Sequence, residues 1–147
     1  MKSIKFLTIF IFVLLTMISC TGSKDSIKFK EAYHYFYRND APQGEQLLRL
    51  QSQKELDNYF GSATVMGKDG APTSINFDKY FVIAKVLPET NHATEINNIK
   101  LTHDNNRIIL GYKTKTHGMT SQDYNIRPTV LLLVNRKYIG SEITEKR

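Results

Sequence analysis

The run from Tyr80 to Leu87, which reads YFVIAKVL, constrains the fold more than any other part of the chain. Alternate residues of an extended chain point to opposite faces, and in this run both sets of side chains are largely apolar. A strand of this kind is expected in the middle of a sheet that is covered on both faces. Pro88 ends the strand because proline has no backbone N–H to donate. The sequence therefore predicts a buried central strand with packing on both sides.

Other segments have the residue pattern of strands and are separated by turn residues. The clearest is Phe29 to Arg38 (FKEAYHYFYR), in which aromatic residues recur at period two. Asp104-Asn105-Asn106 has the composition of a hairpin turn. The strands predicted besides 80–87 are 29–38, 94–101, 107–115, 129–134 and 138–143, and residues 46–50 could form a further short strand.

One helix is predicted, over residues 53–60. Ser52 followed by Glu55 is a capping box, in which each side chain can accept a hydrogen bond from an otherwise unpaired backbone N–H. Leu56 begins an apolar helical face, and Gly61 is placed to end the helix. The predicted fold is therefore α+β and β-dominated, with an antiparallel, meander-like sheet of five or six strands and one inserted short helix.

The start of the chain has the pattern of an export signal. Lys2 and Lys5 precede an apolar run of 13 residues from Phe6 to Ile18. A bilayer-spanning helix needs about 20 such residues, whereas the core of a signal peptide is shorter. Met17 to Cys20 resembles the lipobox of bacterial lipoproteins, whose cysteine receives a diacylglycerol and becomes the new N-terminus. The alternatives are an uncleaved anchor and an ordinary secretory signal cut elsewhere.

The lipobox resemblance implies three parts of the chain. Residues 1–19 are expected to be a lipoprotein signal peptide, residues 20–28 a flexible tether, and residues 29–147 a single β-rich domain. Cys20 is the only cysteine, and an unpaired cysteine in an exported chain calls for an explanation, which lipidation supplies. The expected location is the bacterial cell envelope, outside the cytoplasm, with the outer membrane as the expected site of the anchor.

The charge of the chain argues against a nucleic-acid partner. The formal net charge is +6, and it falls to +4 without Lys2 and Lys5. Lysines and arginines are spread along the rest of the chain with acidic residues among them, so no basic stripe for nucleic acid is expected. The mild positive balance would favour anionic lipid headgroups near the tether, with a weak effect.

No motif of a common catalytic or metal site is recognised. There is no G-x-S-x-G nucleophile motif and no glycine-rich phosphate loop. Glu89, His92 and Glu95 have a spacing that occurs in metal sites. They follow a proline in a predicted loop, however, and lack the helix that would bring this spacing onto one face. The sequence therefore predicts a protein without catalytic residues, metal or cofactor.

Three predicted loops, 88–93, 116–120 and 125–128, could lie near one another in such a sheet. Loops on a rigid scaffold commonly carry binding residues, although these loops could also simply connect strands. The residues that we single out for partner binding are Thr90, Asn91, His92, His117, Gly118, Met119, Arg127 and Pro128.

Residues 46–140 resemble the domain of the protease complex subunit PrcB family of bacterial lipoproteins. The likeness is carried by the segments 47–52 (LLRLQS), 55–56 (EL), 75–79 (INFDK), 82–84 (VIA) and 129–134 (TVLLLV). The P-T-G-G-Y-like turn of that family corresponds to residues 90–94 (TNHAT), which contain no glycine. The resemblance implies a non-enzymatic accessory lipoprotein that stabilises, matures or restrains a secreted protease.

A looser similarity concerns chagasin-like inhibitors of cysteine proteases, which use three adjacent loops, the last of which begins with Arg-Pro. Arg127-Pro128 and the loop at Gly118 occur in the same order, and Thr129 stands where the inhibitors have an aromatic residue. Three hypotheses therefore follow: a protein-binding accessory lipoprotein, a direct protease inhibitor that acts through the three loops, and a carrier of a small or lipidic ligand.

Overall fold

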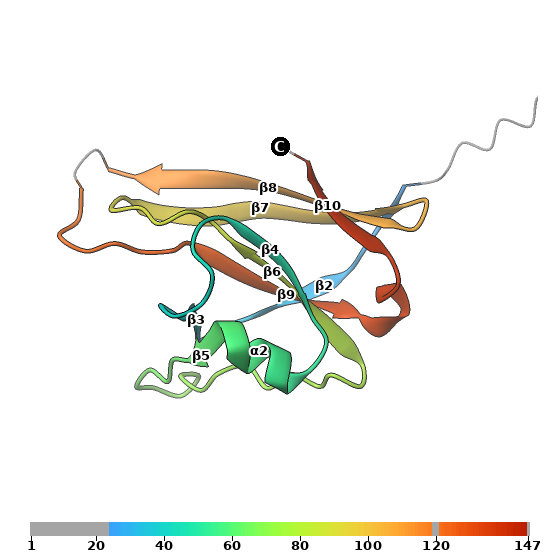
Figure 1. Cartoon of the computed structure of the whole chain (residues 1–147), viewed down its shortest axis with the longest axis horizontal. Coiled ribbons are helices and arrows are strands. Elements are labelled where there is room, and N and C mark those ends of the chain that lie inside the picture. Colours follow the sequence, from blue (N-terminus) through green and yellow to red (C-terminus); the bar gives the residue numbers. More distant parts are fainter. Residues whose placement is uncertain (1–23, 119–120, 147) are drawn as a thin grey trace, which may run out of the picture.

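The computed structural model describes residues 24–118 and 121–146, which form three layers (Figure 1). The outer layer is a sheet with strand order β1-β7-β8-β10, and the middle layer is a sheet with order β2-β9-β6-β4. Helix α2 and the β3–β5 pair form the third layer. The elements are β1 (Asp25–Ser26), β2 (Phe29–Ala32), β3 (Tyr35–Tyr37), β4 (Gln46–Leu50), α2 (Gln53–Tyr59), β5 (Phe60–Ser62), β6 (Tyr80–Val86), β7 (Ala93–Asp104), β8 (Arg107–His117), β9 (Thr129–Asn135), the 3-10 helix η1 (Arg136–Tyr138) and β10 (Glu142–Lys146).

Both faces of the middle sheet are buried. In β6, Phe81 and Ile83 pack toward the outer sheet, in one apolar cluster with Leu110 of β8. Val82 and its alternate neighbours pack on the opposite face, in a second cluster that contains Leu56 of α2. Strand β9 alternates in the same way. The central strand predicted from residues 80–87 is confirmed, because a strand between two apolar layers must be apolar on both faces.

The β-dominated class with one inserted helix is confirmed for the described part of the chain, but the meander and the count of five or six strands are not. Strand β9 lies between β2 and β6, and β10 pairs in parallel with β8. Turn η1 carries the chain from the middle sheet to the outer one, so the segment predicted to fold back over 138–143 instead begins a strand at Glu142 in another layer.

The single strand predicted over 29–38 is wrong. It divides at His34, whose φ of +64° lies in the left-handed region that interrupts an extended chain. Strand β2 before this point pairs with β9, whereas β3 after it pairs with β5. The carbonyl of His34 accepts a hydrogen bond of 2.8 Å from the N–H of Ala63, which fixes the bend.

Residues 25–27, which we predicted to be part of a flexible tether, belong to the folded domain. Asp25 and Ser26 pair with β7, and Ile27 is buried with its N–H bonded to the carbonyl of Leu101. Cys20 and the predicted signal peptide lie outside the described residues. Within the described residues, no helix has the length and apolar character that a membrane crossing requires.

The predicted hairpin over β7 and β8 is confirmed. Asn105 and Asn106 have φ values of +47° and +64°. Two successive residues with positive φ are typical of a type I′ turn, whose twist matches that of the strands it joins. The strands are longer than predicted, which makes this hairpin the longest element of the outer sheet.

The predicted helix is also confirmed, and its first turn is capped. The N–H of Glu55 donates to Ser52 Oγ at 3.2 Å, and the Glu55 carboxylate accepts from the N–H of Gln51 at 2.7 Å. The role predicted for Gly61 is wrong, because the helix ends at Tyr59 and Gly61 lies in β5.

Replacing Ser52 with alanine is expected to lower the free energy of unfolding by about 1 kcal/mol, because the N–H of Glu55 loses its acceptor. Ser52→Asp retains an acceptor at the same position and should retain most of the stability. Urea unfolding of both variants measures the difference. An equal loss in the two variants would show that the cap contributes nothing.

Candidate functional site

Two prolines mark the point at which adjacent strands of the middle sheet leave it. Pro88 follows β6 and Pro128 precedes β9. The last hydrogen bond before the two strands separate runs from the N–H of Leu87 to the carbonyl of Pro128, at 2.9 Å. Beyond the prolines the two loops meet again. Thr90 and Ile126 exchange two backbone hydrogen bonds of 2.9 and 2.8 Å. The loops 88–93 and 125–128 therefore form one connected surface.

The third predicted loop starts at the same end of the molecule. His117, the last residue of β8, pairs with Ala93 at the start of β7, and the N–H of Gln122 donates to the carbonyl of Asn91 at 2.7 Å. We call residues 88–93, 117–118 and 122–128 the loop cluster; it lies at the left in Figure 1. Met119 lies outside the described residues. The other residues singled out from the sequence are all in this cluster: Thr90, Asn91, His92, His117, Gly118, Arg127 and Pro128.

Two ion pairs involve ionisable side chains of the loop cluster. His117 Nε2 lies 3.1 Å from Glu95 Oε1, and this contact lowers the pKa of the Glu95 carboxyl. Glu89 Oε2 lies 3.6 Å from Arg127 Nη2. The carboxylates of the Glu89, His92 and Glu95 pattern thus have separate partners, and among the residues that the structure describes no group of three possible metal ligands lies together.

A cleft of about 400 Å³ opens beside the loop cluster, and Arg127 lies in its wall. We call it the Arg127 cleft. Its lining comes from the loop cluster and from β3 with the residues around it, which are far away in the sequence. The lining residues are Tyr35, Phe36, Tyr37, Asn39, Glu89, Asn125, Ile126, Arg127 and Thr129.

Arg127 is held in place from three sides, yet one of its donors has no partner. Its side chain is 14% exposed, its Nη2 donates to the Gln43 carbonyl oxygen Oε1, and its guanidinium lies 5.8 Å from the ring centroid of Tyr37. Nη1 is buried and finds no acceptor among the described residues. A buried donor without an acceptor costs about 1–3 kcal/mol, and because Nη1 is buried, a binding partner could reach it only if the surrounding side chains moved.

The sequence analysis did not identify Phe36 as part of the site. Its ring is 52% exposed and lies over Gly61 of the paired strand, where a Cβ atom would be only 2.3 Å from Phe36 Cζ. Gly61 therefore makes room for this ring. Tyr124, which precedes the cleft residue Asn125, is 61% exposed. The available signal was the glycine opposite an aromatic residue, but it can be read only once the pairing of β3 with β5 is known.

Comparisons of the chain with protein-family models, with curated proteins and with solved structures returned no match.

Proposed function

We propose that this chain is an exported bacterial lipoprotein, anchored in the cell envelope through a lipid on Cys20, which binds another envelope or secreted protein at the Arg127 cleft. The role is non-enzymatic. A secreted protease is the class of partner that the resemblance to the PrcB family implies.

The proposal is supported chiefly by the way in which the loop cluster and β3 meet around one cleft. Arginine and large aromatic residues are enriched among the residues that contribute most to protein–protein binding. The cleft offers the guanidinium of Arg127 and the half-exposed ring of Phe36. Both are held on a sheet scaffold by hydrogen bonds or packing, which reduces the entropy lost on binding.

Direct inhibition of a protease is a second candidate, and one observation favours it. Loops 88–93 and 125–128 are hydrogen-bonded to each other. Strand β8, which leads into the third predicted loop, 116–120, ends at His117 beside Ala93. Loops that lie side by side on one end of a scaffold can enter an active-site groove together.

Replacing Arg127 or Phe36 with alanine is expected to weaken the partner complex by about 30-fold each, the factor that corresponds to about 2 kcal/mol at a binding hot spot. Affinity is measured with papain-like and subtilisin-like proteases, and protease activity is followed in the same titration. Loss of activity at an equimolar dose identifies an inhibitor, whereas binding without loss identifies an accessory protein.

Two matched substitutions serve as controls. Arg107→Ala removes an exposed arginine at the opposite end of β8, and Tyr33→Ala removes an aromatic side chain that is 58% exposed and does not line the cleft. Both should bind like the unmodified chain. If Arg127→Ala and Phe36→Ala also bind like it, the cleft is not the binding site. Mass spectrometry of the natural protein tests the anchor separately, since an intact N-terminal methionine would contradict lipidation at Cys20.

A further inference from the structure

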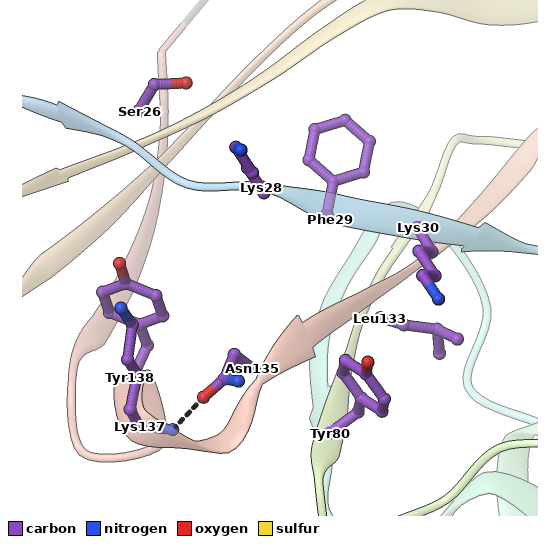
Figure 2. A pocket seen from close by; sticks show the side chains of 9 residues that line it. All are labelled: Ser26, Lys28, Phe29, Lys30, Tyr80, Leu133, Asn135, Lys137 and Tyr138. Atoms are coloured by element: carbon purple, nitrogen blue, oxygen red, sulfur yellow. Dashed lines mark hydrogen bonds between the residues drawn. The ribbon is translucent and has the colours of Figure 1, made fainter.

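A second cleft, of about 600 Å³, lies between the start of β2, the end of β9 and η1 (Figure 2). We call it the lysine cleft. Lys28 and Lys30 come from the β2 side, and Lys137 comes from η1 across the cleft. Its aromatic lining residues are Phe29, Tyr80 and Tyr138.

The three lysines are exposed, and none of them has an acidic partner among the described residues. Among residues 24–118 and 121–146, no carboxylate oxygen lies within 4.0 Å of the Nζ atom of Lys28, Lys30 or Lys137. The Nζ of Lys137 lies 4.8 Å from the ring centroid of Tyr138. The cleft therefore carries three positive charges that no carboxylate neutralises, although the sequence intersperses acidic residues among its basic ones.

The cleft lies at the end of the molecule where the described chain begins. Strand β1, just before Lys28, pairs with residues 102–103 of β7, close to the hairpin turn. The loop cluster adjoins Ala93, at the other end of β7, which is roughly 30 Å away at about 3.3 Å per residue of strand. Figure 1 shows β1 at the right and the loop cluster at the left.

Cys20 is only eight residues before Lys28 in the sequence. Eight residues span at most about 29 Å when fully extended. A lipid on Cys20 would thus hold the lysine cleft within reach of the membrane surface, where lipid phosphates are concentrated.

We propose that the lysine cleft binds the phosphate groups of anionic phospholipids in the membrane that carries the anchor. Lysines near an anionic membrane surface are attracted to it over about a Debye length. The rings of Tyr80 and Tyr138 have an apolar body and a polar tip, which suits the boundary between headgroups and acyl chains. This inference rests on the proposed anchor, and it implies that the loop cluster faces away from the membrane.

The test uses the full acylated chain, purified in detergent and reconstituted into two kinds of vesicle. One kind contains phosphatidylcholine alone, and the other contains phosphatidylcholine with phosphatidylglycerol. An amine-reactive acetylating reagent labels the exposed lysines, and mass spectrometry gives the rate at each site. On anionic vesicles the rates at Lys28, Lys30 and Lys137 should fall by about five-fold, the factor that corresponds to about 1 kcal/mol per lysine, and about 1 M salt should restore them.

Lys54 on α2, Lys68 in the loop after β5 and Lys115 near the loop cluster are exposed internal controls, and their rates should not change. Equal rates on both kinds of vesicle, or equal protection of the control lysines, would overturn the proposal. Protection by inorganic phosphate in detergent, without protection on anionic vesicles, would also overturn it and would identify a site for a free anion.

Failure of the anchor is a separate observation, because a chain that is not acylated will not stay on phosphatidylcholine vesicles. The labelling can still be done by mixing such a chain with anionic vesicles, so the lysine cleft is tested in either case. A variant with Lys28, Lys30 and Lys137 changed to glutamine should lose its preference for anionic vesicles. The same change at Lys54, Lys68 and Lys115 alters the net charge equally and should leave the preference in place.

Discussion

Replacing Glu45 and Glu145 together with glutamine is expected to lower the free energy of unfolding by about 3–5 kcal/mol. The reason is Lys85, whose side chain is 1% exposed in the apolar strand β6. Its Nζ lies 2.7 Å from an oxygen of each glutamate. Without them a buried ammonium group keeps its charge and loses both counter-ions. Urea unfolding at neutral pH measures the loss.

Removing the lysine should cost much less. Lys85→Met fills the same volume with an apolar chain, and the two carboxylates that remain are 31% and 21% exposed, so water can reach them. Carboxylates that water can reach keep their charge at a much smaller cost than a buried ammonium group without counter-ions. Glu142→Gln, at an exposed glutamate of the same strand β10, controls for the change in charge. A double glutamine variant within about 1 kcal/mol of the unmodified chain would contradict this account of Lys85.

The ion cluster of Lys85, Glu45 and Glu145 predicts that the stabilities of the unmodified chain and of the double glutamine variant depend on pH in opposite ways. Burial acts to lower the pKa of Lys85, but the hydrogen bonds that its ammonium group donates to Glu145 and Glu45 outweigh burial, and the pKa is raised. A raised pKa in the folded state stabilises the fold below the ordinary lysine pKa, and this contribution is lost as the pH rises through the folded-state value. In the double glutamine variant burial remains the largest influence on Lys85 and acts to lower its pKa. The unmodified chain should therefore lose stability as the pH rises above about 10.5, the ordinary lysine value, whereas the variant should gain stability as the pH rises toward that value, so the difference between the two proteins should narrow.

The sequence predicts well the elements that are determined by neighbouring residues. The central strand follows from two apolar faces in 80–87, and the helix follows from Ser52 and Glu55. The hairpin follows from Asn105 and Asn106, which tolerate positive φ better than most residues. In each case the residues that determine the structure lie within a few positions of one another.

Features that depend on distant partners were not predicted. Nothing in FKEAYHYFYR indicates that the chain changes sheets at His34, because that change depends on pairing with β5 and β9. The parallel pairing of β10 with β8 depends on turn η1, which local composition describes only as a turn. Lys85 gave no signal of its ion cluster either, since Glu45 and Glu145 are 40 and 60 residues away in the sequence.

The candidate site divides in the same way. The closeness of loops 88–93 and 125–128 could be predicted because each adjoins a long apolar strand, and two such strands tend to pair. Phe36 and the lysine cleft could not be predicted, because their neighbours come from several elements that are far apart in the sequence. For both Phe36 and the lysine cleft, the missing information is which strands pair with each other.

The second large effect on the free energy of unfolding is expected at two facing side chains in the two long strands of the middle sheet, β6 and β9. Leu132 in β9 lies opposite Ile83 in β6, and both side chains are fully buried toward the outer sheet. Leu132→Ala and Ile83→Ala should each lower the free energy of unfolding by about 2–5 kcal/mol, because each leaves a cavity that neighbouring side chains fill only in part. Ile83→Val, which removes one methyl group, should cost about 0.5–1.5 kcal/mol.

The double variant tests whether the two side chains belong to one packing unit. Residues in contact share a cavity, so the loss from Leu132→Ala with Ile83→Ala should differ from the sum of the single losses by about 0.5 kcal/mol or more. Binding at the Arg127 cleft, measured well below the melting temperature, should change little in the single variants, because the hydrogen bonds that join the loops lie beyond Pro88 and Pro128. Strictly additive losses would mean that the two side chains do not share a cavity, and a single loss below about 1 kcal/mol would mean that neither side chain anchors the core on which the binding surface is built.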